Sequence, residues 1–186
     1  MFAHQHPLGV FEFSGRVFDF MNLATLPFPQ PLIALWRVHP GDILGEPIQF
    51  ITRGQWTHAG WLRSDGKTIW ECYYPKMRCR PLNQAEVPGI DLFTLEGMTP
   101  EIAARFERYF DITTSGPSVQ GYSIAGLFEY ALDLPATDEQ NVFCSEADMQ
   151  AIRKVAPALL PLVRCEDSKV SPAELGHSPR LLPVDW

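Results

Sequence analysis

The sequence predicts one α+β domain, in which a small antiparallel β-sheet or half-barrel, mostly from residues 32–95, packs against helices from residues 99–155. Short β-rich runs separated by turn residues fill the first range, and helical hydrophobic patterns fill the second. The 17 prolines divide the chain into short elements and argue against a simple helical bundle. A chain of 186 residues suits one full-sized domain and is short for two.

Strand patterns occur at residues 32–38, 56–62, 68–74 and 90–95, with an edge-like segment at residues 75–81. The second and third runs flank Asp65-Gly66, which is the strongest short-range signal for a β-hairpin. If these two residues form the loop, Leu62 pairs with Ile69, and His58 and Glu71 become diagonal neighbours on one face. A carboxylate in that position would fix the tautomer of the imidazole and raise its basicity.

Helix patterns follow the predicted sheet. Thr99 is the expected N-cap of a first helix, with Pro100 at its first position and a buried stripe at Ile102, Phe106 and Phe110. A second helix is predicted over residues 122–132 and a third after Cys144. The tail from about residue 157 shows no periodicity.

Residues 1–31 form an apolar and aromatic arm, and residues 32–186 form the single domain. The prolines of residues 27–31 end whatever structure precedes them. The arm is expected either to pack on the domain or to contact another subunit, which would make the protein a homo-oligomer.

The net charge of −7, with no long basic run, argues against nucleic acid and anionic membranes as partners. No apolar run approaches the roughly 20 residues of a membrane span. The sequence begins without an evident secretory signal, so a soluble, cytoplasmic protein with reduced thiols is expected. The four cysteines form no C-x-x-C pair, and neither a metal nor a cofactor is predicted.

The most informative stretch is Asn141-Val-Phe-Cys-Ser-Glu-Ala-Asp148. Residues with side-chain oxygens follow Cys144, as is typical of the first turn of a helix. A thiol at a helix N-terminus has a lowered pKa and is a better nucleophile. The alternative is that Cys144 is a small buried residue that only packs. His58 likewise has an alternative as a core histidine bonded to backbone, and Glu71 as a residue of a solvated face.

Together these features resemble the circularly permuted, NlpC-type branch of the papain-like cysteine hydrolases, in particular the YiiX-like group. The resemblance covers about residues 35–180 and depends on the order histidine, acid, cysteine. The segments that carry it are Pro40-Gly-Asp-Ile-Leu44, Thr57-His-Ala-Gly60, Ile69-Trp-Glu71, Gly121-Tyr122, Phe143-Cys-Ser-Glu146, and Ser171-Pro-Ala-Glu-Leu175 with Ser178-Pro179.

The resemblance implies a papain-like fold in which Cys144 is the nucleophile, His58 the general base and acid, and Glu71 the group that orients His58. Tyr122 and Ser145 are weaker candidates for oxyanion or substrate binding. The implied enzyme is a thiol hydrolase that cleaves an amide bond in a peptide or amino-acid conjugate through an acyl-enzyme. Two alternatives stay open: acyl transfer or thioester chemistry on lipid or ester substrates, as in the lecithin-retinol acyltransferase group, and a catalytically silent binding or assembly domain.

Overall fold

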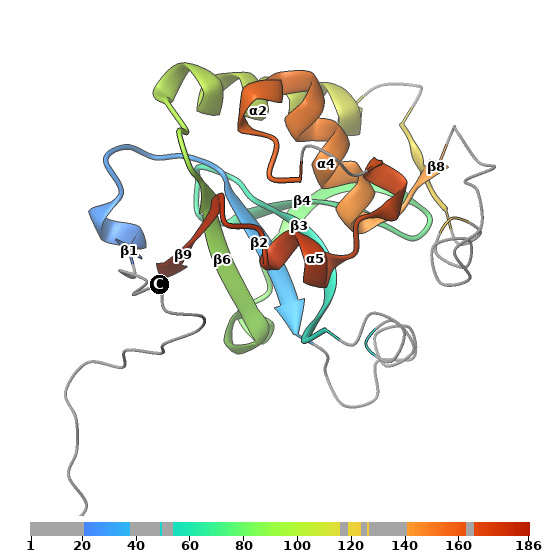
Figure 1. Cartoon of the computed structure of the whole chain (residues 1–186), viewed down its shortest axis with the longest axis horizontal. Coiled ribbons are helices and arrows are strands. Elements are labelled where there is room, and N and C mark those ends of the chain that lie inside the picture. Colours follow the sequence, from blue (N-terminus) through green and yellow to red (C-terminus); the bar gives the residue numbers. More distant parts are fainter. Residues whose placement is uncertain are drawn as a thin grey trace, which may run out of the picture.

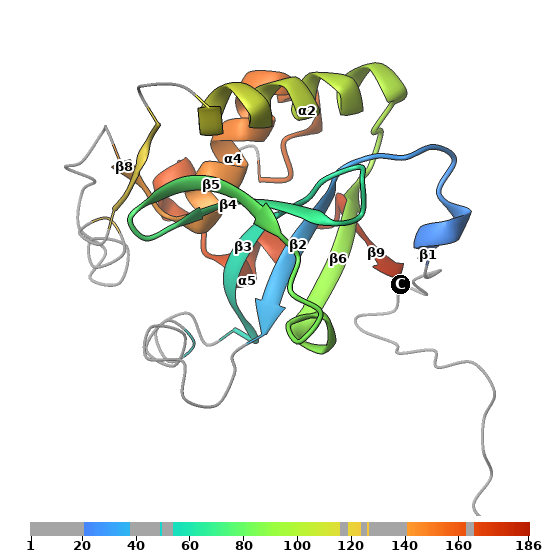
Figure 2. The same ribbon diagram turned by 180° about the vertical axis from the view of Figure 1, so that it is seen from behind.

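The computed structural model describes residues 21–37, 49, 54–115, 119–123, 126, 141–162 and 166–186. Within this part of the chain, nine strands form one curled sheet in the order β1-β9-β6-β2-β3-β4-β5-β7-β8. Helices cover one face of the sheet (Figures 1 and 2). The predicted α+β class and half-barrel sheet are confirmed.

The strands of the sheet are β1 (Met21–Asn22), β2 (Leu32–Arg37), β3 (Trp56–Leu62), β4 (Thr68–Tyr73), β5 (Lys76–Pro81), β6 (Ile90–Leu95), β7 (Gly121–Tyr122), β8 (Asn141–Val142) and β9 (Leu181–Asp185). The α-helices are α2 (Pro100–Ser115), α4 (Cys144–Val155) and α5 (Pro172–Gly176). Short 3-10 turns are η1 (Leu23–Thr25), η2 (Val87–Gly89), η3 (Pro157–Leu159) and η4 (Asp167–Lys169). None of the described helices combines the length and apolarity that crossing a membrane requires.

Strand β2 lies at the centre of the sheet, antiparallel to both β3 and β6. All its residues except the last are buried, because both faces of the strand are covered. Ile33 and Leu35 belong to a large hydrophobic cluster with α2 and α4. Leu32, Ala34 and Trp36 belong to a smaller cluster on the other face. The sheet therefore separates two hydrophobic clusters.

The β3–β4 hairpin has the register that the sequence predicts, with Leu62 opposite Ile69 and Trp61 opposite Trp70. Asp65 stabilises the loop by accepting hydrogen bonds from the backbone N–H groups of Lys67 and Thr68, each at 2.8 Å. Gly66 has a φ of 65°, a left-handed conformation that favours glycine. The regular pairing ends at Trp61 and Trp70, and beyond it the two backbones still lie close together at Gly60, next to Glu71.

Helix α2 confirms the prediction for the segment that begins after Thr99. The Thr99 hydroxyl accepts a hydrogen bond from the Ile102 backbone N–H at 3.3 Å. Phe106 stacks on Trp61 and Phe110 packs on Trp70, each pair with ring centroids 4.7 Å apart. These contacts tie the helix to the β3–β4 hairpin.

The tail contains regular structure that its sequence pattern does not predict. β9 pairs antiparallel with β6 and parallel with β1. Helix α5 begins with a capping box, in which the Ser171 hydroxyl accepts from the Glu174 backbone N–H at 3.1 Å. Pro183 inside the strand hides its pattern, because proline normally demotes a run from strand status.

Two further expectations are wrong. Tyr122 belongs to strand β7 and not to the start of a helix, because the backbone around it pairs with β5 and β8. The sheet is also mixed and not wholly antiparallel, since β7 and β8 pair in parallel, as do β1 and β9. Of the predicted helix, residues 124–125 and 127–132 lie outside the described residues, as do Val38, residues 40–44 and Cys165.

The part of the predicted arm that the structure describes, residues 21–31, lies against the sheet. The Gln30 side chain is buried and donates a hydrogen bond from Nε2 to Thr94 Oγ1 at 2.9 Å. Leu23 and Leu26 pack on the smaller cluster. Residues 1–20 of the arm lie outside the described residues.

Candidate functional site

His58 and Glu71 are in direct contact, as the hairpin register predicts. The imidazole Nε2 of His58 lies 2.9 Å from Oε2 of Glu71, whose side chain is fully buried. Gly60 makes this approach possible, because a Cβ at that position would lie 2.8 Å from the Trp70 carbonyl oxygen and 3.1 Å from Glu71 Cβ. The two strands can therefore approach closely only where residue 60 has no side chain.

Two arginines from β5 bind the same carboxylate. Oε1 of Glu71 accepts hydrogen bonds from Arg78 Nε at 2.8 Å, Arg78 Nη2 at 2.7 Å and Arg80 Nε at 2.7 Å. The sequence pattern predicts only an edge-like segment at residues 75–81 and does not indicate a role for either arginine. Alternation alone puts residues 78 and 80 on one face of their strand. That this face meets Glu71 depends on the register of β4 and β5, in which Arg78 is the cross-strand partner of Glu71.

The surroundings of Glu71 keep it ionised. Burial would raise the pKa of this carboxyl, but the hydrogen bonds and charges of His58 and Arg80 hold its pKa well below the ordinary value. A permanent negative charge therefore lies beside one nitrogen of the His58 ring.

Cys144 is buried at the first residue of α4 and belongs to the larger cluster. The side chain of Glu146 accepts a hydrogen bond from the Phe143 backbone N–H at 3.4 Å and so closes the first turn. Burial alone would raise the pKa of the Cys144 thiol. The hydrogen bond and charge of His58, with the backbone N–H groups of Ala59 and Ser145, lower it below the ordinary value.

The pKa of His58, which interacts with Cys144, shifts in the opposite direction. Burial would lower the pKa of His58, but its interactions with Cys144 and Glu71 raise the pKa to about 10. Because Nε2 faces Glu71, Nδ1 is the ring nitrogen left for the thiol. The ring is held between Trp36 and Tyr73, with centroid distances of 5.0 and 5.6 Å. The three side chains thus form a row of thiol, imidazole and carboxylate.

The two weaker candidates differ in their surroundings. Tyr122 lies near enough to Cys144 for the thiolate charge to act on it, and burial together with that charge raises the pKa of its hydroxyl. The buried hydroxyl of Ser145 instead donates to the Val170 carbonyl oxygen at 2.6 Å. Ser145 therefore interacts with the Cys144 sulfur through its backbone N–H and not through its hydroxyl.

The other described thiols have different environments. Cys72 is buried and donates to the Val142 carbonyl oxygen at 3.3 Å, and burial raises its pKa. Cys79 is half-buried and accepts a hydrogen bond from the Thr114 hydroxyl at 3.6 Å. Among the described residues, Cys144 is the cysteine that has a basic partner, and no group of three or more potential ligands there is placed to hold a metal ion.

No protein-family model matches the sequence, and a search of curated proteins finds no match.

Proposed function

We propose that this protein is a thiol hydrolase of the permuted papain-like type, which cleaves an amide bond in a peptide or amino-acid conjugate. The observation that carries the proposal is that the pKa values of Cys144 and His58, which interact with each other, shift in opposite directions. The pKa of Cys144 is lowered while that of His58 is raised to about 10. These shifts favour the thiolate form of Cys144 and the imidazolium form of His58.

In the proposed reaction, the Cys144 thiolate attacks the carbonyl carbon of the amide. His58 then donates the proton on Nδ1 to the leaving amine, and an acyl-enzyme remains on the sulfur. Neutral His58 next takes a proton from water, which attacks the thioester and releases the acid. Glu71 keeps its bond to Nε2 throughout and so fixes the ring orientation.

Tyr122 is proposed to assist at the tetrahedral intermediate. Its raised pKa keeps the hydroxyl protonated and able to donate a hydrogen bond to the oxyanion. The hydroxyl of Ser145 has no place in this scheme, because it is buried and bonded to Val170. The chain supplies His58 first, then Glu71 and last Cys144. This order of histidine, acid and cysteine is the one on which the resemblance to the permuted type depends.

The decisive experiment is the pH dependence of Cys144 alkylation by iodoacetamide, read by peptide mass spectrometry in the full chain. We expect Cys144 to react as a thiolate at pH values well below the free-cysteine pKa of about 8.5. His58→Ala should return the apparent pKa to that value or above it, and Glu71→Gln should move it part of the way. Cys79 in the same samples provides an internal reference thiol. An ordinary Cys144 pKa that neither substitution changes would show that no ion pair exists.

A further inference from the structure

The charges around Glu71 are not balanced. One carboxylate faces three groups that carry positive charge when His58 is protonated: His58, Arg78 and Arg80. Arg80 has a second partner, since its Nη2 lies 2.8 Å from Glu86 Oε2. In the described part of the chain Arg78 has no second carboxylate. Arg78 is therefore the least neutralised cation of the group.

Arg78 is also the outermost of these cations. Its side chain is 38% exposed, compared with 22% for Arg80 and 18% for His58. Nε and Nη2 bind Glu71, whereas Nη1 has no partner among the described residues. The guanidinium edge formed by Nη1 and the second N–H of Nη2 is thus available to a ligand from solvent.

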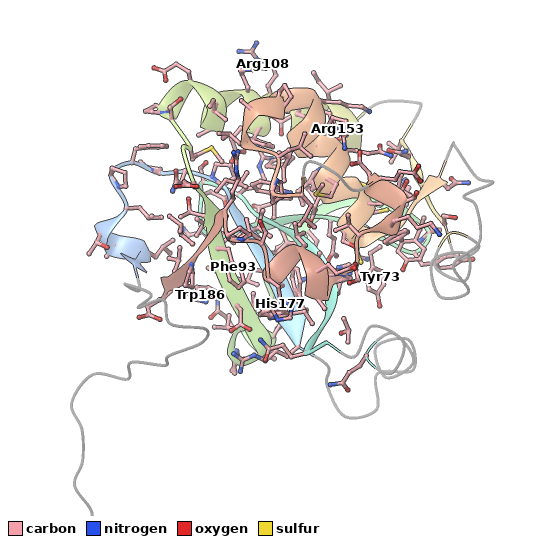
Figure 3. The ribbon with its side chains drawn as sticks, viewed as in Figure 1. Tyr73, Phe93, Arg108, Arg153, His177 and Trp186 are labelled. Carbon is pink, nitrogen blue, oxygen red and sulfur yellow. The ribbon has the colours of Figure 1, made fainter. Side chains whose placement is uncertain are left out.

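Tyr73 connects this guanidinium to the candidate catalytic histidine. Arg78 Cζ lies 4.4 Å from the centroid of the Tyr73 ring, and the same centroid is 5.6 Å from that of His58. Tyr73 is 45% exposed and is one of the labelled side chains in Figure 3. Stacking on the ring and bonding to Glu71 hold the arginine in one orientation. The Tyr73 ring is therefore a common neighbour of the His58 imidazole and the Arg78 guanidinium.

We propose that Tyr73 and Arg78 form a recognition site for a carboxylate on the substrate, close to the bond that Cys144 attacks. A planar guanidinium edge with parallel N–H groups matches a carboxylate in a bidentate arrangement. The proposal rests on the proposed function of Cys144 and adds the class of its substrate, an anionic acyl compound such as a peptide or conjugate with a carboxylate beside the scissile amide.

The test compares iodoacetate with iodoacetamide as alkylating agents for Cys144 at neutral pH and low salt. The two probes have similar size and differ in charge, so the ratio of their rate constants reports attraction of a carboxylate. Dividing by the same ratio for glutathione removes their intrinsic difference in reactivity. We expect a normalised ratio above one, which falls by about fivefold in Arg78→Gln, the order expected for one unit charge at contact in water.

Matched variants separate recognition from net charge. Arg108 is exposed on α2 and projects away from the sheet, so Arg108→Gln removes one positive charge and should leave the ratio unchanged (Figure 3). Tyr73→Leu, which keeps the charge but removes the stacking surface, should lower the ratio by about twofold. Added salt should lower the ratio in the unsubstituted protein, because it screens a partly exposed charge.

The possible failures are distinguishable. If iodoacetamide labels Cys144 no faster than Cys79, the proposed function is wrong and the carboxylate site is overturned with it. If iodoacetamide labels Cys144 rapidly but the ratio is the same in Arg78→Gln, only the carboxylate site is overturned. Should Arg78→Gln not fold, a ratio in the unsubstituted protein that salt does not change overturns it equally.

Discussion

At the scale of single residues, the site depends on contacts of two different origins. The His58–Glu71 pair follows from local register and could be predicted, because a tight Asp65-Gly66 hairpin leaves few ways to align its strands. The contribution of Arg78 and Arg80 required the register of the next strand. That register was not predictable, since the Tyr74-Pro75 connection gives no such turn signal.

Asp148 is a second buried carboxyl at the site, and its environment is the opposite of that of Glu71. Among the described residues, neither of its carboxyl oxygens meets the geometry of a hydrogen bond, although the indole N–H of Trp61, itself unsatisfied, lies near enough to lower the pKa of Asp148. Burial and the thiolate charge of Cys144 raise the pKa of Asp148 well above its ordinary value. Above the unfolded-state pKa of about 3.9 this raised pKa destabilises the folded protein.

We therefore predict that Asp148→Asn increases the free energy of unfolding at neutral pH by about 1–2 kcal/mol, because a neutral side chain avoids the cost of burying an ionisable one. The gain should disappear in acid, where the carboxyl is protonated in both states. Urea unfolding at several pH values measures it, with the exposed Asp185→Asn as control. A loss of stability at neutral pH would contradict the prediction and indicate an ionised carboxylate with a stabilising partner.

At the scale of elements, the length of a strand decided whether it could be predicted. Strands β2, β3, β4 and β6 have six or seven residues and carry readable patterns. β1, β7 and β8 have two residues each, too few for any periodicity. They form because distant parts of the chain bring their backbones together.

The close approach of β3 and β4 gives a prediction about the hairpin. Gly60→Ala places a Cβ against the Trp70 carbonyl oxygen, so the strands must move apart. We expect a loss of about 1–3 kcal/mol in the free energy of unfolding. We also expect the apparent pKa of Cys144 to rise, because Glu71 can no longer hold His58 in place. Urea unfolding and the pH profile of alkylation measure the two effects.

Gly66→Ala is the matched control in the same hairpin. No atom of the described residues lies within 4 Å of the added Cβ, and the cost comes from the left-handed φ of 65°. That cost is about 1 kcal/mol. The Cys144 pKa should stay unchanged in this variant. Equal pKa shifts in both glycine variants would mean that the site responds to hairpin stability and not to the position of Glu71.

At the scale of the whole molecule, the thiol packs on one face of the sheet, and the smaller cluster on the other face reaches the site through Trp36, whose ring packs on His58. Cys144 belongs to the larger cluster, which fills the space between the sheet and helices α2 and α4. The smaller cluster on the opposite face contains Leu92, which is buried on β6 between β2 and β9. The side chains of this second cluster stabilise the same fold, and Cys144 is not one of them.

Two substitutions of similar size should therefore have different effects on the site. Leu92→Ala and Ile152→Ala each remove a buried aliphatic side chain and should each cost about 2–5 kcal/mol. Ile152→Ala loosens α4, which carries Cys144, so the apparent pKa of that thiol should move toward the free-cysteine value. Leu92→Ala should leave it unchanged in the folded protein. A pKa shift in Leu92→Ala as large as that in Ile152→Ala would show that the two faces of the sheet are coupled, because loss of packing on one would then be transmitted to His58 and Cys144.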